Sequence, residues 1–271
     1  MYELFESVKR LKSPQISVVI SIFNGAEFLE KSIQSLNDQT YKDFEIIAIN
    51  DCSTDNSAIM LKEMIKNNRI SLLINNKSNI GLTKSLNLGI SQSNAVYIAR
   101  QDIDDISLPH RLQKQIDMIK DFDLIGGLAV SKYVNSNKEL ISGSKSNESL
   151  IKTIFLKSPF THSSAFFRRD KFLEIGGYNE KFTVSQDFEL WMRFAKNGNV
   201  GIVKSVIVKR LVHDNMISRK KPLKQIYFSN KARFMHPERG YFLPVIFLLN
   251  QFIAAFTPRL IKELIKTFTK N

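Results

Sequence analysis

The sequence predicts an α/β protein with a mostly parallel sheet flanked by helices and a C-terminal helical extension. Short β-branched runs alternate with helically spaced apolar residues over the first 130 residues, and a polar cluster follows each run. Repeated strand–helix units favour a parallel sheet with right-handed crossovers. Ligands bind such sheets beyond the carboxyl ends of the strands, so the polar clusters predict a site at one sheet edge.

Four strands are predicted from their β-branched composition, which is typical of strands buried in a parallel sheet. They comprise residues 16–22, 44–50, 70–74 and 95–100. A helix follows each strand, marked in turn by Leu29, Ile33 and Leu36, by a start near Asp55, by Leu82, Leu86 and Ile90, and by Leu112, Ile116 and Ile119. Pro109 suits the first turn of the last helix.

The chain is expected to divide into a catalytic domain, residues 1–218, and a basic, amphipathic helical tail, residues 219–271. Within the domain, residues 14–130 form the predicted nucleotide-binding half and residues 131–218 the acceptor-side half. The boundary between the halves is the polar stretch 131–149, which is expected to be a loop or hairpin.

The net charge of +13 is concentrated at the C-terminus. From residue 204 onward there are 14 Lys and Arg against 3 Asp and Glu, whereas the first 203 residues contain 25 and 23. A nearly neutral body argues against a nucleic-acid partner. One cysteine, Cys52, and an N-terminus without an apolar stretch predict a cytoplasmic protein.

Two carboxylate clusters follow predicted strands. Asp51 lies between a strand and a helix, where it either belongs to a turn or accepts a hydrogen bond from a nucleotide. Asp102, Asp104 and Asp105 fall within four residues. Such a cluster is either a solvated acidic turn or a site for Mg²⁺ or Mn²⁺, because mutual repulsion disfavours it without a cation.

These segments resemble glycosyltransferase family 2, which has the GT-A fold. The resemblance covers residues 16–218 and includes the segments 14–57, 79–82 and 102–109 in the family's order. It implies an inverting transfer of a sugar from a nucleotide-sugar, with Mn²⁺ or Mg²⁺ as cofactor. On this mapping the nucleotide-sugar pocket comprises Ser21, Phe23, Asp51, Asn79, Gly81 and Asp102. Phe23 either stacks on the base or packs in the core.

The resemblance also implies the metal ligands and the base. Asp102 and Asp104 form the family's Asp-x-Asp element, with Asp104 as the direct ligand, and His213 joins the metal or the diphosphate. Asp187 is the expected catalytic base, because inversion needs a carboxylate opposite the leaving group. The alternative is that Asp187 only caps a helix at residues 188–196.

The acceptor side is expected to include His162 and Trp191. His162 lies where similar proteins place a histidine near the acceptor, and a structural histidine is the alternative. Trp191 either stacks on a sugar or packs in the core. The Gln-x-x-Arg-Trp motif of processive members is missing after Asp187, which predicts single additions.

The tail combines an uncharged stretch, residues 241–257, with a basic amphipathic helix, residues 259–270. This pattern is typical of an interfacial anchor on an anionic membrane, here at the inner face of the cell membrane. Helices packed on the domain, or across a homodimer, are the alternative. Membrane association is preferred because packing has little use for the concentrated positive charge.

The sequence therefore predicts a membrane-associated bacterial glycosyltransferase that moves one sugar, from a UDP-sugar, to a glycan or lipid-linked acceptor in surface polysaccharide biosynthesis. One alternative is a sugar-nucleotide nucleotidyltransferase, disfavoured because no Gly-rich basic loop follows the first strand. The other is a nucleic-acid-binding protein that uses the basic tail.

Overall fold

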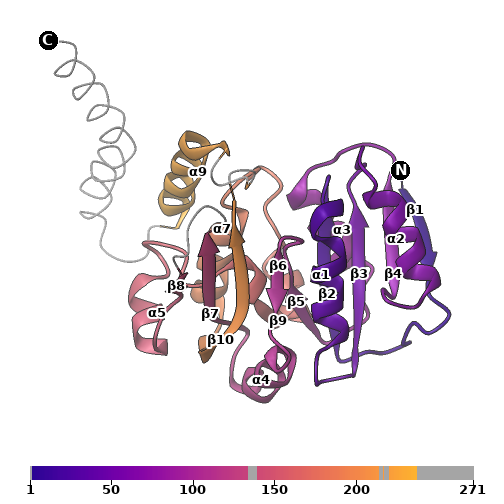
Figure 1. Cartoon of the computed structure of the whole chain (residues 1–271). Coiled ribbons are helices and arrows are strands. Elements are labelled where there is room, and N and C mark those ends of the chain that lie inside the picture. Colours follow the sequence, from indigo (N-terminus) through magenta and orange to yellow (C-terminus); the bar gives the residue numbers. More distant parts are fainter. Residues whose placement is uncertain (1, 134–138, 214–215, 217–219, 237–271) are drawn as a thin grey trace, which may run out of the picture. The chain divides into compact units, whose positions relative to one another are not determined.

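The computed structural model describes residues 2–133, 139–213, 216 and 220–236 (Figure 1). It divides into two units, residues 1–213 and 214–271. In the second unit the described residues form helix α9 (Pro222–Met235). The apolar stretch and the amphipathic helix expected in the tail lie outside the described residues. Within the described part of the chain, no helix is long and apolar enough to cross a membrane.

The first half of unit one is a parallel sheet. Its strands, in spatial order, are β4 (Leu72–Asn76), β3 (Phe44–Asn50), β2 (Ile16–Ile22) and β5 (Tyr97–Arg100). The register pairs Ile22 with Asn50, so the carboxyl ends of β2 and β3 finish together. β1 (Tyr2–Glu6) pairs antiparallel with the outer edge of β4. The predicted parallel sheet is confirmed in this half.

The second half of the sheet mixes strand directions. Beyond β5 the order is β9 (Phe166–Arg168), β7 (Leu124–Tyr133), β10 (Val200–Val212) and β6 (Asp105–Ser107), and β8 (Glu139–Ser142) pairs with β7. β10 runs parallel to β7, whereas β9, β6 and β8 pair antiparallel with their neighbours. Residues 101–104, which contain Asp102 and Asp104 and are called the acidic loop below, connect β5 to β6. Because β6 pairs with β10, this half brings residues near 105 next to residues near 210.

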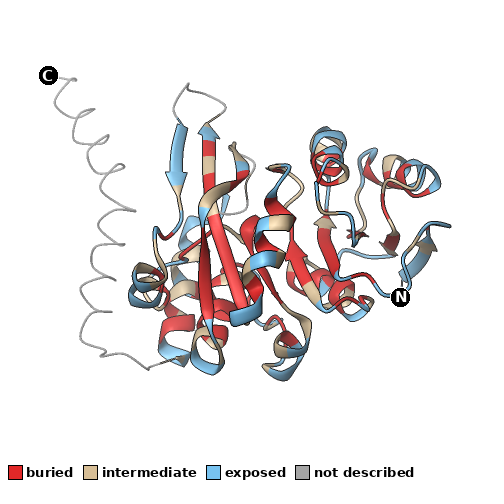
Figure 2. Cartoon of the chain, turned by 90° about the horizontal axis from the view of Figure 1, so that it is seen from below, coloured by how far each residue is buried: buried red, intermediate tan, exposed pale blue. Residues whose placement is uncertain are grey.

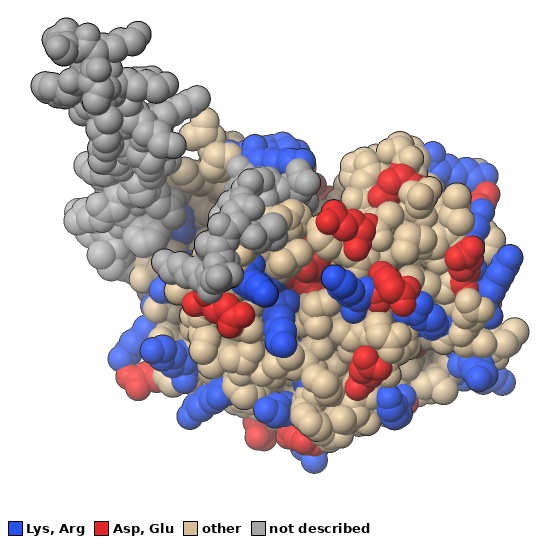
Figure 3. Space-filling view, in the orientation of Figure 1, with Lys and Arg blue, Asp and Glu red and all other residues tan. Residues whose placement is uncertain are grey.

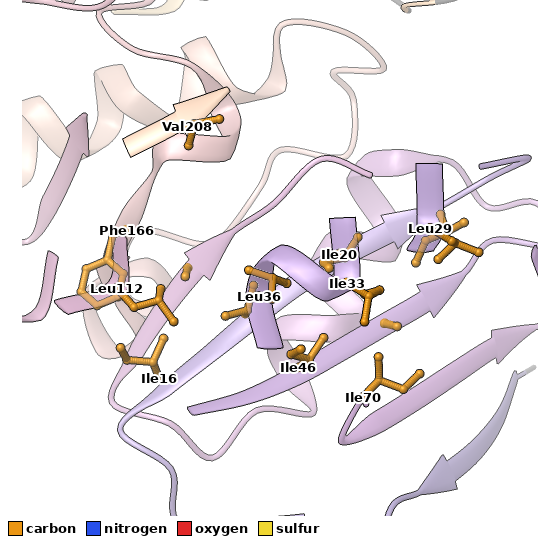
Figure 4. Packing of buried hydrophobic residues seen from close by; sticks show 14 of the residues in the cluster. Ile16, Ile20, Leu29, Ile33, Leu36, Ile46, Ile70, Leu112, Phe166 and Val208 are labelled. Carbon is orange, nitrogen blue, oxygen red and sulfur yellow. The ribbon is translucent and has the colours of Figure 1, made fainter. Parts of the chain in front are cut away.

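Helices cover both faces of the sheet (Figure 1). One face packs on α1 (Ala26–Asn37), α2 (Ser57–Lys66) and α4 (Arg111–Met118). The other packs on α3 (Leu82–Ser91), α5 (Asn147–Thr153), α6 (Arg169–Glu174) and α7 (Gln186–Asn197). Figure 4 shows Leu29, Ile33 and Leu36 of α1 beside strand residues in the hydrophobic core on the side of α1, α2 and α4. Figure 2 shows the central strands buried along most of their length.

The predicted elements of the first 130 residues are confirmed, with shifted ends. β4 begins two residues later than expected, and α2 begins at Ser57 rather than near Asp55. Pro109 does not open α4, because His110 is the N-cap and Arg111 the first helical residue. The polar stretch after residue 131 contains part of the β7–β8 hairpin, as one of its two alternatives predicted.

Gly126 of β7 should not tolerate a larger side chain. A Cβ atom at this position would overlap the ring of Phe160, which is buried in the core on the side of α3 and α7. We expect Gly126→Ala to lower the free energy of unfolding by about 1–3 kcal/mol, the usual cost of overpacking a core. Urea denaturation measures it. Adding Phe160→Leu to this variant should restore part of the loss, and an alanine variant as stable as the wild type would contradict the packing described.

Candidate active site

The carboxyl ends of the parallel strands bring most of the predicted donor-site residues to one edge. Ser21 is the second-last residue of strand β2, and Asp51 directly follows β3, where its N–H donates to the carbonyl of Ile22. Asn79 and Gly81 follow β4, and Asp102 follows β5. This grouping confirms the edge expected for a parallel sheet.

Asp51 anchors the loop between β4 and α3. Its Oδ1 accepts hydrogen bonds from Asn76 Nδ2 and Ile80 N, both at 2.9 Å, and its Oδ2 accepts one from Gly81 N at 2.8 Å. The residue is only 2% exposed. The carboxylate therefore fixes the loop at the start of α3, a task that the sequence did not predict. A bond from a nucleotide to Asp51 stays a prediction.

Gly81 allows this loop to turn into the helix. It precedes α3 with φ at 87° and ψ at 156°, a conformation that residues with a Cβ rarely adopt. The requirement is one of backbone conformation alone, because a Cβ would meet no atom within 4 Å. Asn79, two residues earlier, is exposed at the sheet edge.

The loop after β2 presents an aromatic ring to solvent. Phe23 is 51% exposed, so the core alternative for this residue is wrong and its ring is available for stacking. The neighbouring Asn24 has φ at 53°, and its Oδ1 accepts a hydrogen bond from Thr54 N at 2.8 Å. Ser53 Oγ in turn accepts one from Asn24 N at 3.0 Å. Hydrogen bonds therefore connect the loop after β2 to the loop after β3.

A buried arginine holds the first carboxylate of the acidic loop. Arg100 is fully buried and donates from Nη2 to Asp102 Oδ1 at 2.5 Å, and from Nη1 to the carbonyl of Val19 at 2.9 Å. Burial alone would raise the pKa of Asp102, but the Arg100 guanidinium holds this pKa below its usual range. Asp102 thus stays charged, with one oxygen committed to the protein and a third of its side chain exposed.

Asp104 lies against His213, which comes from the end of β10. His213 Nε2 and Asp104 Oδ2 are 3.0 Å apart. The imidazole also stacks on Phe28 of α1, with ring centroids 5.1 Å apart. Burial raises the pKa of Asp104, and the Asp102 carboxylate raises it further. Asp104 and His213, which the sequence assigned to a metal although they are 109 residues apart, are therefore in contact.

Asp105, the first residue of β6, is more deeply buried than Asp104. It is 2% exposed, its Oδ2 accepts a hydrogen bond from Ser163 Oγ at 2.5 Å, and its Oδ1 is buried without a partner among the described residues. Burial, with the charges of Asp102 and Asp104, raises its pKa to about 8. Ser163 Oγ also accepts from Asp102 N at 2.9 Å, so one hydroxyl connects the two carboxylate residues.

The acidic loop fits a divalent cation that a substrate helps to bind. Among the described residues, no three His, Cys, Asp or Glu side chains converge as a complete metal site. Asp104 and His213 converge as a pair, and a third of the Asp102 side chain is exposed. Mg²⁺ is commonly held by one or two carboxylates plus substrate phosphates, so an incomplete protein site fits this chemistry.

Asp187 lies in the first turn of α7. The N-cap of this helix is Ser185, whose φ is 56°, so the alternative that Asp187 is the cap is wrong. Burial raises the pKa of Asp187, and the Asp102 carboxylate raises it as well. A carboxylate with raised proton affinity, near the acidic loop, has the properties of a general base.

The predicted acceptor-side residues lie deeper than expected. Trp191 is fully buried among Phe160, Phe167 and Phe194, so the sugar-stacking alternative is wrong and the core alternative is confirmed. His162 Nε2 is 2.7 Å from Tyr178 Oη, and its Nδ1 is 3.9 Å from Asp102 Oδ1. Burial and Arg100 lower the pKa of His162 to about 3, which favours a neutral structural histidine. Contact between His162 and an acceptor stays a prediction.

Sequence reasoning missed the residues that support the site. Arg111 is fully buried in α4 and donates to Gln101 Oε1 and Ser107 Oγ, both at 2.8 Å. Burial and Arg100 lower the pKa of Arg111 to about 9. The sequence carries no signal for Arg111, because its helical neighbours Lys114 and Gln115 are polar. Phe28 and Ser163 carry no signal either.

The surface of the described residues has no large area of one charge on the face in Figure 3. Acidic and basic side chains alternate across it. This agrees with the nearly neutral count for the first 203 residues.

Comparison with known proteins reveals one consistent similarity. The model of the family described as Glycosyl transferase family 2 matches residues 17–176. The amylovoran biosynthesis glycosyltransferase AmsE of Erwinia amylovora is 29% identical over 76% of this chain and 79% of its own length. An uncharacterized glycosyltransferase of Methanocaldococcus jannaschii is 29% identical over 95% of this chain and 94% of its own.

Solved structures share the fold. The structure of S. aureus TarS 1-349 in complex with UDP-GlcNAc has a TM-score of 0.69 at 16% identity, covering 89% of this chain and 73% of that one. The complex of the same protein with UDP has a TM-score of 0.66 at 17% identity, covering 90% and 72%. The fold class expected from the sequence is thereby confirmed.

Asp51→Asn should destabilise the loop before α3. An asparagine would turn one oxygen into an N–H₂ group facing a backbone N–H or the amide of Asn76, so a buried donor would lose its acceptor. We expect a loss of about 1–3 kcal/mol in the free energy of unfolding. Thermal or urea denaturation without nucleotide measures it. Asp38→Asn, at an exposed carboxylate, is the matched control. Equal stability of both variants would show that the carboxylate does not anchor the loop.

Proposed function

This chain belongs to glycosyl transferase family 2, and on that premise we propose that it transfers a single sugar from a nucleotide-sugar with inversion. One observation carries the proposal: the acidic loop after β5 contacts His213, and its Asp102 carboxylate raises the pKa of Asp187, so groups suited to a metal and to a base act on one another. Members of this family are typically metal-dependent, and they use a donor and an acceptor.

The nucleoside of the donor would bind the loops after β2, β3 and β4. Phe23 supplies an exposed ring for the base, and Ser21, Asn79 and Gly81 supply polar atoms at the same edge. Asp51 would act chiefly by holding the loop after β4 in place. A uracil base is proposed because TarS is described with UDP and UDP-GlcNAc.

The donor diphosphate would meet a cation at Asp104. Asp104 and His213 would hold Mn²⁺ or Mg²⁺, while Asp102 keeps one oxygen for the metal or a donor hydroxyl. When bound, the metal supplies a Lewis acid that neutralises charge on the leaving diphosphate. The Arg100–Asp102 ion pair supports this division, because it keeps Asp102 ionised and fixed.

Asp187 would remove the proton of the acceptor hydroxyl. Inversion requires the acceptor oxygen to attack the anomeric carbon from the side opposite the leaving group. The position of Asp187 at the start of α7, on a different element from the acidic loop, supports this separate role. The acceptor would be a glycan or lipid-linked sugar of a bacterial surface polysaccharide, by analogy with the relative named for amylovoran biosynthesis.

We propose that the protein is cytoplasmic and bound to the inner face of an anionic membrane. The concentration of basic residues from 204 onward supports it. A homodimer through the C-terminal helices is the alternative use of the tail. The domain boundary near residue 218 likewise remains a proposal.

Asp104→Asn should weaken the metal site. Its carboxylate is the proposed direct ligand, so the variant should lose more Mn²⁺ affinity, in the presence of nucleotide, than the roughly 10- to 100-fold that loss of an outer-shell partner costs. Calorimetric titration of Mn²⁺ into the nucleotide complex measures this loss. Asp117→Asn, at an exposed carboxylate of α4, is the control. Wild-type Mn²⁺ affinity in the Asp104 variant would rule out its role as a ligand.

Asp187→Asn should strongly slow transfer and leave donor binding unchanged. A general base contributes about 10²- to 10⁴-fold to a rate, so kcat should fall within that range. Donor affinity, measured by titration with a nonreacting nucleotide, should stay unchanged because the base contacts the acceptor. Asp121→Asn is an exposed control on the same chain. A parallel loss of nucleotide affinity would place Asp187 in the donor site instead.

A further inference from the structure

Arg210 lies among the carboxylates of the site without a role in the function proposed above. It belongs to β10, where it pairs in register with Asp105 of β6. Its positive charge lowers the pKa of Asp105, of Asp187 and of Asp102, although each of these shifts has larger causes. The strand register therefore places Arg210 opposite Asp105, and its charge also acts on a carboxylate of the loop before β6 and on one of α7.

The Nε–H group of Arg210 is not used by the described residues of the protein. Its Nε is buried and has no hydrogen-bond partner within the described residues. The two fully buried arginines nearby are bound at their Nη atoms: Arg100 bonds to Asp102 and to carbonyls, although its Nε also has no partner within the described residues, and Arg111 bonds to four side chains or carbonyls. An unpaired buried donor is costly, so a group that is absent from the protein chain is the natural partner.

The ligand chemistry follows from the shape of the guanidinium and its location. A guanidinium offers paired N–H donors in a plane, which match two oxygens of a phosphate. His213, three residues further along the same chain, contacts Asp104 of the metal site. Arg210 is paired with Asp105, the residue after Asp104, on the strand that ends at His213, so it borders the place where a diphosphate would meet the cation. One divalent cation does not neutralise both the diphosphate and the surrounding carboxylates.

We propose that Arg210 binds the terminal phosphate of the nucleoside diphosphate, as part of the donor and as the leaving group. The inference rests on the proposed function, because it needs a nucleotide-sugar donor. In the transfer, the acceptor oxygen forms a bond to the anomeric carbon while the bond from that carbon to the diphosphate breaks. The electron pair goes to the phosphate oxygen, and the acceptor proton goes to Asp187. Arg210 stabilises the charge that this oxygen gains.

The proposal is tested by comparing a nucleoside diphosphate with its own monophosphate. Wild-type protein is first titrated calorimetrically with UDP, GDP, CDP, ADP and dTDP in Mn²⁺, and the tightest ligand and its monophosphate are used thereafter. Arg210→Gln should weaken diphosphate binding by about 10- to 100-fold, the value of a charge-assisted hydrogen bond. Monophosphate binding should not change. The diphosphate affinity of Arg210→Lys should fall between those of the wild type and Arg210→Gln, because lysine keeps the positive charge but lacks the paired planar donors of a guanidinium.

Two controls separate this role from others. Lys209→Gln removes a charge from the exposed neighbour on β10 and should leave both affinities unchanged. Repeating the titrations in EDTA separates Arg210 from the metal, because the difference between wild type and Arg210→Gln should persist there. Equal weakening of the monophosphate and the diphosphate would overturn the proposal, as would unchanged diphosphate binding. A wild-type protein that binds none of the diphosphates would instead overturn the proposed function.

Discussion

The ion pair between Arg100 and Asp102 is the interaction on which the site depends. Arg100 is fully buried, and a buried charge is stable only with a partner and further hydrogen bonds. Asp102 and the carbonyl of Val19 supply them. Arg111 extends the arrangement, since it donates to the carbonyl of Arg100 at 2.6 Å. The turn between β5 and β6 is thereby fixed to the middle of the sheet.

This frame gives three neighbouring carboxylates different properties. Asp102 is held ionised by Arg100, whereas burial and mutual repulsion raise the pKa of Asp104 and of Asp105. Asp104 faces His213, and Asp105 faces Ser163 and the strand that carries Arg210. An Asp-x-Asp-Asp sequence thus becomes three distinct groups, and only their surroundings distinguish them.

Much of the nucleotide-binding half could be read from the sequence, because strands β2 and β3 are long apolar runs and each ends in polar residues. β6 and β9 contain three residues each, too few to show a period. Contacts such as Phe28 with His213 join distant segments and leave no local pattern. Trp191 was ambiguous because a residue in an amphipathic helix can face a core or a ligand, and burial alone decides between them.

The stacking of Phe28 on His213 has a consequence for how the protein is made. One ring comes from the first helix of unit one and the other from the last residue of that unit. The parallel strands β2 to β5 end by Arg100 and pair with one another, so during synthesis they can assemble first. The proposed cation site must wait until more than a hundred further residues have left the ribosome. A nascent chain that is already compact is therefore still catalytically immature.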